Sequence, residues 1–403
     1  MALERTFASL AVRNFRLYFF GQIASISGMW MQVVAQSWFV LQATGSGVAV
    51  GVVTGLQYLP LMLGAPWAST VIDRFDRRRL LLVTQGAMGI LATSVWVASA
   101  TGSLTVELLY VSSAAYGLVQ PFDNPARRLF VLEMVGRERL SNAVGLNAAV
   151  FTTGQMLGPA IGGLLISVSG TTACFFLNAL SYGAILVALM RMRSAELEPF
   201  ARAAPAAGHV REGLRYVRRT PNVLWPMALT AVASTLLLNY PVILPLLAQR
   251  TFDGGAGLFG GMFALLSVGS VIGALATAAR GRTTRRAVAL AAAAFGAIAI
   301  LVALAPALWM VLVLLLVLGA ADQVFSSNSG AYIQMETDPA YRARVVALYS
   351  ALFVGSKGIA GIIAGGLAEL IGPRGALAVA GGVTAFVACF ALRSQRRSAG
   401  RRP

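Results

Sequence analysis

The sequence predicts an all-α membrane protein in which twelve transmembrane helices form two pseudo-symmetric six-helix bundles, with both termini in the cytoplasm. Three observations lead to this prediction: an apolar composition, a one-sided distribution of arginine and an internal repeat. The chain of 403 residues is 57% hydrophobic and 12% charged, whereas an ordinary soluble domain is about 45–50% apolar and about 25% charged. Such a chain is expected in a lipid bilayer.

Each predicted span is an apolar segment of about 20 residues or more, the length that crosses a hydrocarbon core about 30 Å thick. Turn residues or arginine clusters separate consecutive segments and mark loops at the membrane surface. The twelve segments cover residues 14–42, 47–71, 80–101, 104–124, 141–168, 171–192, 222–249, 256–279, 286–305, 307–333, 343–371 and 375–394.

The placement of the arginines decides how the net charge of +17 is interpreted. In a soluble protein this charge would indicate binding to nucleic acid. Here the arginines are dispersed over short segments between the spans, which argues against a nucleic-acid partner. With both termini on one side, 29 of the 31 arginines fall on that side, and only Arg250 and Arg374 fall on the other. This positive-inside bias predicts cytoplasmic termini and a place in the inner, cytoplasmic membrane.

The longest hydrophilic stretch divides the spans six and six. The predicted domains are an N-terminal bundle (1–192), a cytoplasmic linker (193–221), a C-terminal bundle (222–394) and a basic tail (395–403). Within the linker, Val210, Leu214 and Val217 recur about one helical turn apart, which predicts an amphipathic helix at the cytoplasmic interface.

An internal repeat relates the two bundles by a shift of 203 residues. Two similar bundles in one chain predict a parallel repeat about an axis along the membrane normal, with the substrate site between the halves near the midplane. The aligned positions are Glu133 with Glu336, Arg139 with Arg342, Gly158 with Gly361, and Gly162-Gly163-Leu164 with Gly365-Gly366-Leu367.

The loop between the second and third spans reads STVIDRFDRRR, residues 69–79. It resembles the G-x-x-x-D-R-x-G-R-[KR] loop of the major facilitator superfamily, with Asp73, Arg74, Arg77 and Arg78 on the charged positions. The resemblance implies a cytoplasmic gating network in which Asp73 acts with Arg77 and Arg78. Asp76 replaces a glycine of the pattern, and we expect it to keep a left-handed turn, which Asp tolerates better than most residues. An ordinary positive-inside loop is the alternative.

The fifth span matches the G-x8-G-x3-G-P-x2-G-G signature of exporters and antiporters in the same superfamily. Its glycines form a ridge that lets another helix approach closely, and its proline removes a backbone donor and allows bending. A generic tightly packed helix is the alternative. The matching residues are Gly145, Gly154, Gly158, Pro159, Gly162 and Gly163.

Two longer stretches carry a more specific resemblance. Residues 122–151, FDNPARRLFVLEMVGRERLSNAVGLNAAVF, and residues 212–221, EGLRYVRRTP, look like the major facilitator subgroup that includes the enterobactin exporter. The resemblance implies the major facilitator fold and a monomeric permease that exports drugs or siderophores. The fourth span departs from many drug/proton antiporters because it lacks their membrane-embedded arginine. Arg127 and Arg128 lie near its cytoplasmic end, which argues against proton coupling through this span.

Polar residues on one face of the first span are expected to turn inward, because lipid disfavours them. In the superfamily, spans 1, 4, 7 and 10 line the central cavity. Such a cavity would suit a bulky amphipathic solute. Alternatively, the glutamines on this face form hydrogen bonds between helices and do not line a cavity. The candidate lining residues are Gln22, Ser25, Met29, Gln32 and Gln36, with Asn239, Tyr240, Gln323 and Ser326.

Asp322 and Lys357, the only lysine, lie at similar depths in the tenth and eleventh spans, about 22 Å along a helix. A charged pair that separates in one conformation could exchange a proton at that moment. We expect Asp322 to accept the proton and Lys357 to be its switchable partner, with the proton gradient as energy source and no cofactor. Two alternatives stay open: Lys357 attracts an anionic substrate, or the pair is structural.

The function that these patterns favour is secondary export of amphipathic small molecules, drugs or siderophores, by proton antiport. Import or flipping of a nutrient or lysophospholipid is the nearest alternative, and a non-transporting membrane receptor is a further one. An enzyme is not expected, because the sequence contains no metal-ligand cluster and no nucleophile with a matching base. A phosphate-binding loop is excluded, since the single lysine follows Gly355-Ser356 inside an apolar span.

Overall fold

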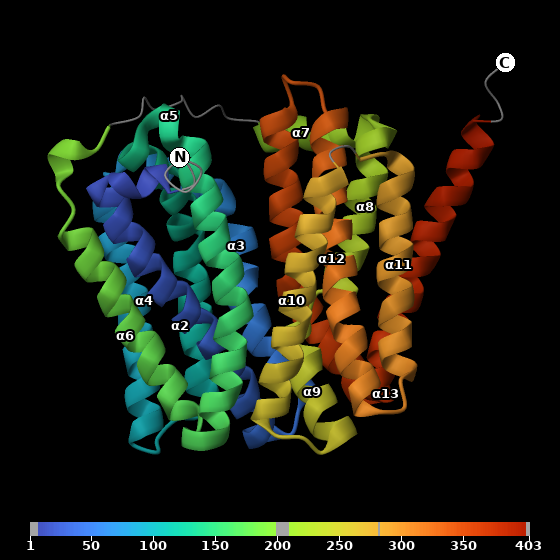
Figure 1. Cartoon of the computed structure of the whole chain (residues 1–403), viewed down its shortest axis with the longest axis horizontal. Coiled ribbons are helices and arrows are strands. Elements are labelled where there is room, and N and C mark those ends of the chain that lie inside the picture. The colour runs from blue at the N-terminus through green and yellow to red at the C-terminus, as the bar shows by residue number, and fades with distance from the viewer. Residues whose placement is uncertain (1–6, 199–208, 281–282, 400–403) are drawn as a thin grey trace. The chain divides into compact units, whose positions relative to one another are not determined.

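The structure, a computed structural model, describes residues 7–198, 209–280 and 283–399, and the side chains of some of these residues, including Asp73, lie outside the description (Figure 1). Every element in these ranges is a helix, which confirms the all-α prediction. The elements are η1 (Ala8–Ala11), α2 (Arg13–Thr44), α3 (Gly47–Arg74), α4 (Arg77–Ala100), α5 (Val106–Ser169), α6 (Thr171–Met190), η2 (Ser194–Glu196), α7 (His209–Arg219), α8 (Pro221–Leu236), α9 (Tyr240–Phe252), α10 (Ala256–Arg280), α11 (Arg285–Leu304), α12 (Leu308–Glu336) and α13 (Arg342–Ala399).

Eight helical stretches of the described chain are long and apolar enough to cross a membrane. They include α5 and α13, which each contain more than one predicted span. The helix α2 is outside this set because its polar residues, several glutamines among them, lower its hydropathy. The twelve-span count therefore stays a prediction.

Two helices are too long to be single spans. At 1.5 Å per residue, the 64 residues of α5 would extend about 96 Å if they were straight, about three times the hydrocarbon thickness. Each is interrupted by a glycine with positive φ: Gly136 (φ 68°) in α5 and Gly372 (φ 75°) in α13. Glycine adopts this backbone conformation without the steric penalty of a Cβ. The backbone kinks at Gly136, between the predicted spans 104–124 and 141–168.

The predicted span 222–249 is discontinuous. It consists of α8 and α9, separated by a non-helical stretch at residues 237–239. The second helix begins at Tyr240 with Pro241 in its first turn. Proline favours this position because its missing N–H would have no partner there. The two helices of this span therefore meet at the polar residues Asn239 and Tyr240.

The chain divides into two compact units: Met1–Ala43 with Pro60–Pro205, and Thr44–Leu59 with Ala206–Pro403. The division at 205/206 falls inside the predicted linker. The helix α3 is shared, because its N-terminal half groups with the second unit and the rest with the first. The division within α3 falls at Pro60, which has no amide hydrogen to donate to the helix.

In the first unit, the segments predicted to be cytoplasmic meet at one end. Ser9 N–H donates to Asn142 Oδ1 at 3.0 Å, and Asn14 Nδ2 donates to the Arg193 carbonyl at 2.9 Å. Arg78 Nε at the start of α4 donates to the Leu189 carbonyl at 2.8 Å. The N-terminal segment, the start of α4 and the residues around α6's end are thus on the same side of this unit.

In the second unit, the predicted amphipathic helix is formed as α7 and packs against α13 and α8 (Figure 1). Tyr216 stacks on Tyr341 with ring centroids 4.5 Å apart, and its hydroxyl accepts from the Asp338 N–H at 3.0 Å. Val217 is buried in this contact, whereas Leu214 is 40% exposed. The side chain of Val210 lies outside the description.

Candidate functional site

The second unit contains a polar site around Asp322 on α12. Its carboxylate accepts hydrogen bonds from the Tyr240 hydroxyl at 3.1 Å and from the Ser326 hydroxyl at 3.2 Å. Asp322 is 14 residues after Leu308, the first residue of α12, which places it about 21 Å along the helix. The tertiary structure therefore brings together three predicted residues from the seventh and tenth predicted spans.

Lys357 on α13 is the positive charge of this region. Its ammonium lies over the Phe353 ring, 5.4 Å from the centroid, and interacts electrostatically with the Asp322 carboxylate. The ion pairs among the described side chains do not include these two residues. The cation is thus held by a ring face while the carboxylate is held by hydroxyls, so the two charges are neighbours without a direct ion pair.

Hydroxyl contacts extend the polar site along α8, α12 and α13. Thr230 and Ser329 hydroxyls lie 2.7 Å apart, and the Ser356 hydroxyl donates to that of Ser234 at 2.8 Å. The Tyr349 hydroxyl donates to the Ser326 carbonyl at 3.3 Å. Sequence reasoning missed Tyr349 and Phe353. Their spacing of four residues with Lys357 was the available signal, since residues at this spacing share one helix face.

The break between α8 and α9 lies beside this polar site. Asn239 is only 1% exposed, and its side-chain amide nitrogen has no hydrogen-bond partner among the described residues. Discontinuous helices with free polar groups are a recurrent way of building substrate sites in secondary transporters. Gln323, also predicted to line a cavity, instead donates to Ser327 on its own helix at 3.0 Å.

The predicted polar face of α2 makes hydrogen bonds inside the first unit. Gln22 Oε1 accepts from Arg127 at 2.9 Å, and Gln36 Nε2 donates to Ser113 at 2.5 Å. Gln32 accepts from Asn178 on α6. Ser25 is buried and Met29 is half-buried. These contacts correspond to the alternative of bonding between helices, and a cavity-lining role for the five residues stays a prediction.

Asp123 and Arg127 form a buried charge pair on α5, which the sequence analysis did not identify. Asp123 is 1% exposed and accepts from Arg127 at 2.5 Å, Thr84 at 2.7 Å and Gln85 at 2.6 Å. Thr84 and Gln85 lie about two turns into α4, roughly 11 Å from its start. The i,i+4 spacing of an acid and an arginine was the available signal.

Three polar atoms around this pair have no hydrogen-bond partner among the residues that the structure describes. They are the Tyr18 hydroxyl, the Gln22 amide nitrogen and the Gln85 carbonyl oxygen, all buried. Buried polar groups are nearly always hydrogen-bonded to protein or water. The Asp123–Arg127 pair is therefore a second buried site with polar groups still available, in a different unit from Asp322.

The loop before α4 uses its arginines as structural anchors. Arg77 forms an ion pair with Glu133 on α5, and Arg78 donates to the carbonyls of Leu189 and Met190. Arg74 is exposed. The side chain of Asp73 lies outside the description, so its gating role stays a prediction.

Asp76 in the same loop is not left-handed as expected. Its backbone is extended (φ −62°, ψ 125°), and its carboxylate caps α4 by accepting from the Arg79 N–H at 2.8 Å. Aspartate is among the preferred residues at a helix N-cap. The residue that replaces the family's glycine therefore starts a helix rather than sustaining a glycine-like turn.

The glycine signature of the fifth predicted span forms a ridge on the second half of α5, and this ridge packs against α2. A Cβ on Gly154 would lie 2.6 Å from Ile26, and one on Gly158 would lie 2.5 Å from Trp30 Cβ. Gly162 faces Met31, and Pro159 and Gly163 are buried in the same region. Gly145 differs, because a Cβ there would meet nothing within 4 Å.

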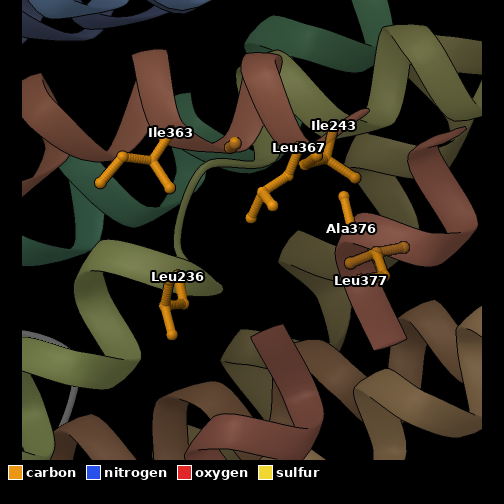
Figure 2. A pocket seen from close by; sticks show the side chains of 7 residues that line it. Leu236, Ile243, Ile363, Leu367, Ala376 and Leu377 are labelled. Atoms are coloured by element: carbon orange, nitrogen blue, oxygen red, sulfur yellow. The ribbon is translucent and has the colours of Figure 1, made fainter. Parts of the chain in front are cut away.

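An apolar recess in the second unit, shown in Figure 2, lies between α8, α9 and two parts of α13. It is too narrow to hold a water molecule. None of the predicted cavity residues lines it, so we assign it to imperfect packing and not to substrate binding. Its lining residues are Leu236, Ile243, Ile363, Ala364, Leu367, Ala376 and Leu377. The described part of the chain also contains no group of three or more His, Cys, Asp or Glu that could hold a metal.

Comparisons with known proteins agree with this architecture. Residues 4–400 match the family described as transmembrane secretion effector. The multidrug efflux pump Tap of Mycolicibacterium fortuitum is 28% identical over 369 residues, which cover 88% of this chain and 89% of Tap. The enterobactin exporter EntS of Escherichia coli O1:K1 is 25% identical, with 91% and 88% covered. The nucleoside transporter NupG has the same fold, with a TM-score of 0.74 at 10% identity, covering 94% of this chain and 98% of NupG.

Proposed function

Because the chain belongs to the transmembrane secretion effector family of the major facilitator superfamily, we propose that it is a secondary active exporter of amphipathic small molecules, driven by proton influx. Membership of this family makes the chain a multi-pass membrane transporter and not an enzyme. Export is supported by the two curated relatives, an efflux pump and a siderophore exporter. Import or flipping has no comparable support among them.

The proposed orientation places both termini in the cytoplasm and the chain, as a monomer, in the inner membrane. The arginine distribution supports it. So does the meeting of predicted cytoplasmic segments at one end of the first unit. In the second unit, α7 with its arginines lies at one end, while Arg250 contacts Gly45, a residue of a predicted outer loop.

The proposed substrates are bulky and amphipathic, either cationic drugs or anionic siderophores. The site around Asp322 offers one carboxylate, one ammonium, several hydroxyls and the rings of Tyr240, Tyr349 and Phe353. Aromatic faces bind flat apolar solutes and cations. Lys357, which has no direct ion pair with an acid, could attract an anionic substrate such as a catecholate.

For coupling, we assign Asp322 as the proton acceptor and Lys357 as its switchable partner. The observation that carries this proposal is the geometry of Asp322, which accepts hydrogen bonds from Tyr240 and Ser326 beside the Lys357 ammonium, and this ammonium forms no ion pair among the described side chains. A proton delivered to the carboxylate neutralises it and removes its attraction for Lys357. Loss of that attraction changes the relative energy of the two conformations, which is the requirement for coupling a proton to transport.

The test uses everted membrane vesicles with an imposed pH gradient and a fluorescent amphipathic cation as probe. Asp322→Asn should abolish gradient-driven accumulation, because the amide cannot take up the proton, while leaving probe binding measurable. Glu107→Gln, at an exposed acid in the first turn of α5, is the control and should transport normally. Unchanged gradient-driven transport by Asp322→Asn would refute the coupling role.

Substitution of Lys357 separates the alternatives for the ammonium. Coupling or anion capture should tolerate Lys357→Arg better than Lys357→Met, because Arg keeps the positive charge. A defect confined to anionic substrates would assign Lys357 to substrate binding, whereas a defect for every substrate would assign it to coupling. Equal stability loss in both variants with normal transport would indicate a structural role.

A further inference from the structure

The N-terminal half of α3 packs against α13 through glycines on both helices. Gly47, Gly51 and Gly55 recur every four residues and form one stripe on α3. A Cβ on Gly55 would lie 3.0 Å from the carbonyl oxygen of Gly358, and a Cβ on Gly51 would overlap the carbonyl of Gly361. At the next turn, Gly47 faces Gly365 in the same way. We call this contact the glycine seam. Its backbones approach so closely that no side chain fits between them.

A carboxylate on α13 closes the end of the seam. Glu369 Oε1 accepts from the Ser46 hydroxyl at 2.5 Å and from the Val48 N–H at 3.1 Å. Val48 is in the first turn of α3, so Glu369 caps the N-terminus of a helix far from it in sequence. Carboxylates are favoured there by the helix dipole and by charge-assisted hydrogen bonds.

The loop before α3 makes a second contact, with α9. Arg250 at the end of α9 donates to the carbonyl of Gly45, and it also interacts electrostatically with Glu369. The loop therefore has one acidic and one basic contact, both supplied by helices of the C-terminal repeat. Among the described residues, Arg250 is the charged group that acts on Glu369, and the N-terminal half of α3 contains no charged residue.

The glycine seam joins helices that belong by sequence to different repeats, and this bears on the transport motion. Residues 44–59 belong by sequence to the N-terminal repeat, yet they pack within the second unit. In transporters built from two parallel repeats, the repeats rock against each other around a central site. A seam between elements of different repeats must part, or α3 must bend at Pro60, for such a motion to open this end.

We propose that Glu369 is a positioning residue whose hydrogen bonds to Ser46 and Val48 hold the N-terminal half of α3 against α13. We call these two hydrogen bonds the latch, and we infer that breaking them opens the outer side of the transporter. The proposal rests on the proposed alternating-access function and orientation. It assigns no substrate contact to Glu369. It predicts that weakening the latch raises the fraction of time for which the glycine seam is open.

The experiment measures opening directly, by thiol labelling at the seam. Thr54 is 6% exposed and lies against Gly361, so Thr54→Cys places a thiol of similar size inside the closed seam. The native Cys174 and Cys389 are replaced by Ala. A membrane-impermeant maleimide is added to the outer face of intact cells, and the labelling rate is followed without substrate and without a proton gradient.

Glu369→Gln should raise the labelling rate of Thr54→Cys about fivefold, because an exposed charge-assisted contact contributes modestly. Ser46→Ala, which removes the partner hydroxyl, should raise it in the same direction. Glu107→Gln removes an acid from the outer end of a different unit and should leave the rate unchanged. A rate in Glu369→Gln equal to that in Glu107→Gln would overturn the latch. If Glu369→Gln does not fold, as judged by size-exclusion chromatography, the labelling rate of Ser46→Ala is compared with that of Glu107→Gln instead, and equal rates would overturn the latch.

A second pair of variants tests the seam. A Cβ on Gly365 would overlap the carbonyl of Gly47, whereas a Cβ on Gly366 would meet nothing within 4 Å. Gly365→Ala should therefore raise labelling and Gly366→Ala should not, and equal rates would overturn the seam as the closing contact. Because the assay needs no transport, Glu369-dependent labelling in a chain that exports no probe would count against the proposed function and leave the latch standing.

Discussion

Replacing Asp123 by Asn should destabilise the first unit by about 3 kcal/mol, since removing one member of a buried ion pair leaves the other charge uncompensated. Asp123 accepts three hydrogen bonds in a nearly fully buried position. Arg127 would keep its contact with Gln22, and its side chain is 20% exposed, so the cost belongs at the lower end of the usual range of about 3–5 kcal/mol.

The assay is a thermal unfolding series in detergent with a double-mutant cycle. A loss of about 3 kcal/mol corresponds to a decrease in Tm of about 6–12 °C for a unit of this size. Arg127→Gln should cost a similar amount. The double variant Asp123→Asn/Arg127→Gln should cost much less than the sum of the two, because neither charge remains without a partner.

The exposed Arg193–Glu196 pair, at 2.9 Å with side chains 64% and 39% exposed, is the matched control in the same unit. Its variants should change stability by no more than about 1 kcal/mol. Effects of Asp123→Asn and Arg127→Gln that add within about 0.5 kcal/mol would show independent sites. Such additivity would refute the argument that the pair is stabilised by mutual compensation.

Two further predictions each compare the same type of substitution at a buried position and at an open or exposed position. Gly158→Ala should destabilise the first unit by about 1–3 kcal/mol through overpacking against Trp30, whereas Gly145→Ala, in open space, should be neutral or stabilise by up to about 1 kcal/mol; thermal unfolding that ranks them the other way would contradict the assigned ridge. Val217→Ser should release α7 from the second unit because Val217 is 3% exposed, while Leu214→Ser, at a 40% exposed side chain, should not. Limited proteolysis before α8 measures this release, and equal cleavage of the two variants would count against docking through Val217.

Several elements of the fold could be predicted because their causes are local. The predicted boundaries between consecutive apolar segments include Gly136 and Gly372, and the structure has a non-helical backbone at both glycines. The break in the seventh predicted span was not expected, because residues 222–249 were predicted to form one apolar span. The structure places three non-helical residues before Tyr240, and the buried side-chain nitrogen of Asn239 there has no hydrogen-bond partner in the described part of the chain.

The candidate site was predicted less completely than the fold. Asp322, Tyr240 and Ser326 were named from the sequence, and the structure joins them by hydrogen bonds. Tyr349 and Phe353 were not named, although their four-residue spacing with Lys357 places all three residues on one helix face. Asp123 was not named, because its burial arises from tertiary contacts with Thr84 and Gln85 on α4.

The sequence by itself determined the class of protein and the extents of most apolar helices. These are consequences of hydrophobicity and of backbone sterics, which depend on each residue and its near neighbours. Only the tertiary structure decided which partner each polar side chain takes: Gln22 with Arg127, Arg77 with Glu133, and Ser46 with Glu369. Those partners are far apart in the chain, and many donors and acceptors of the same chemistry compete for each, so only the packing of helices selects one.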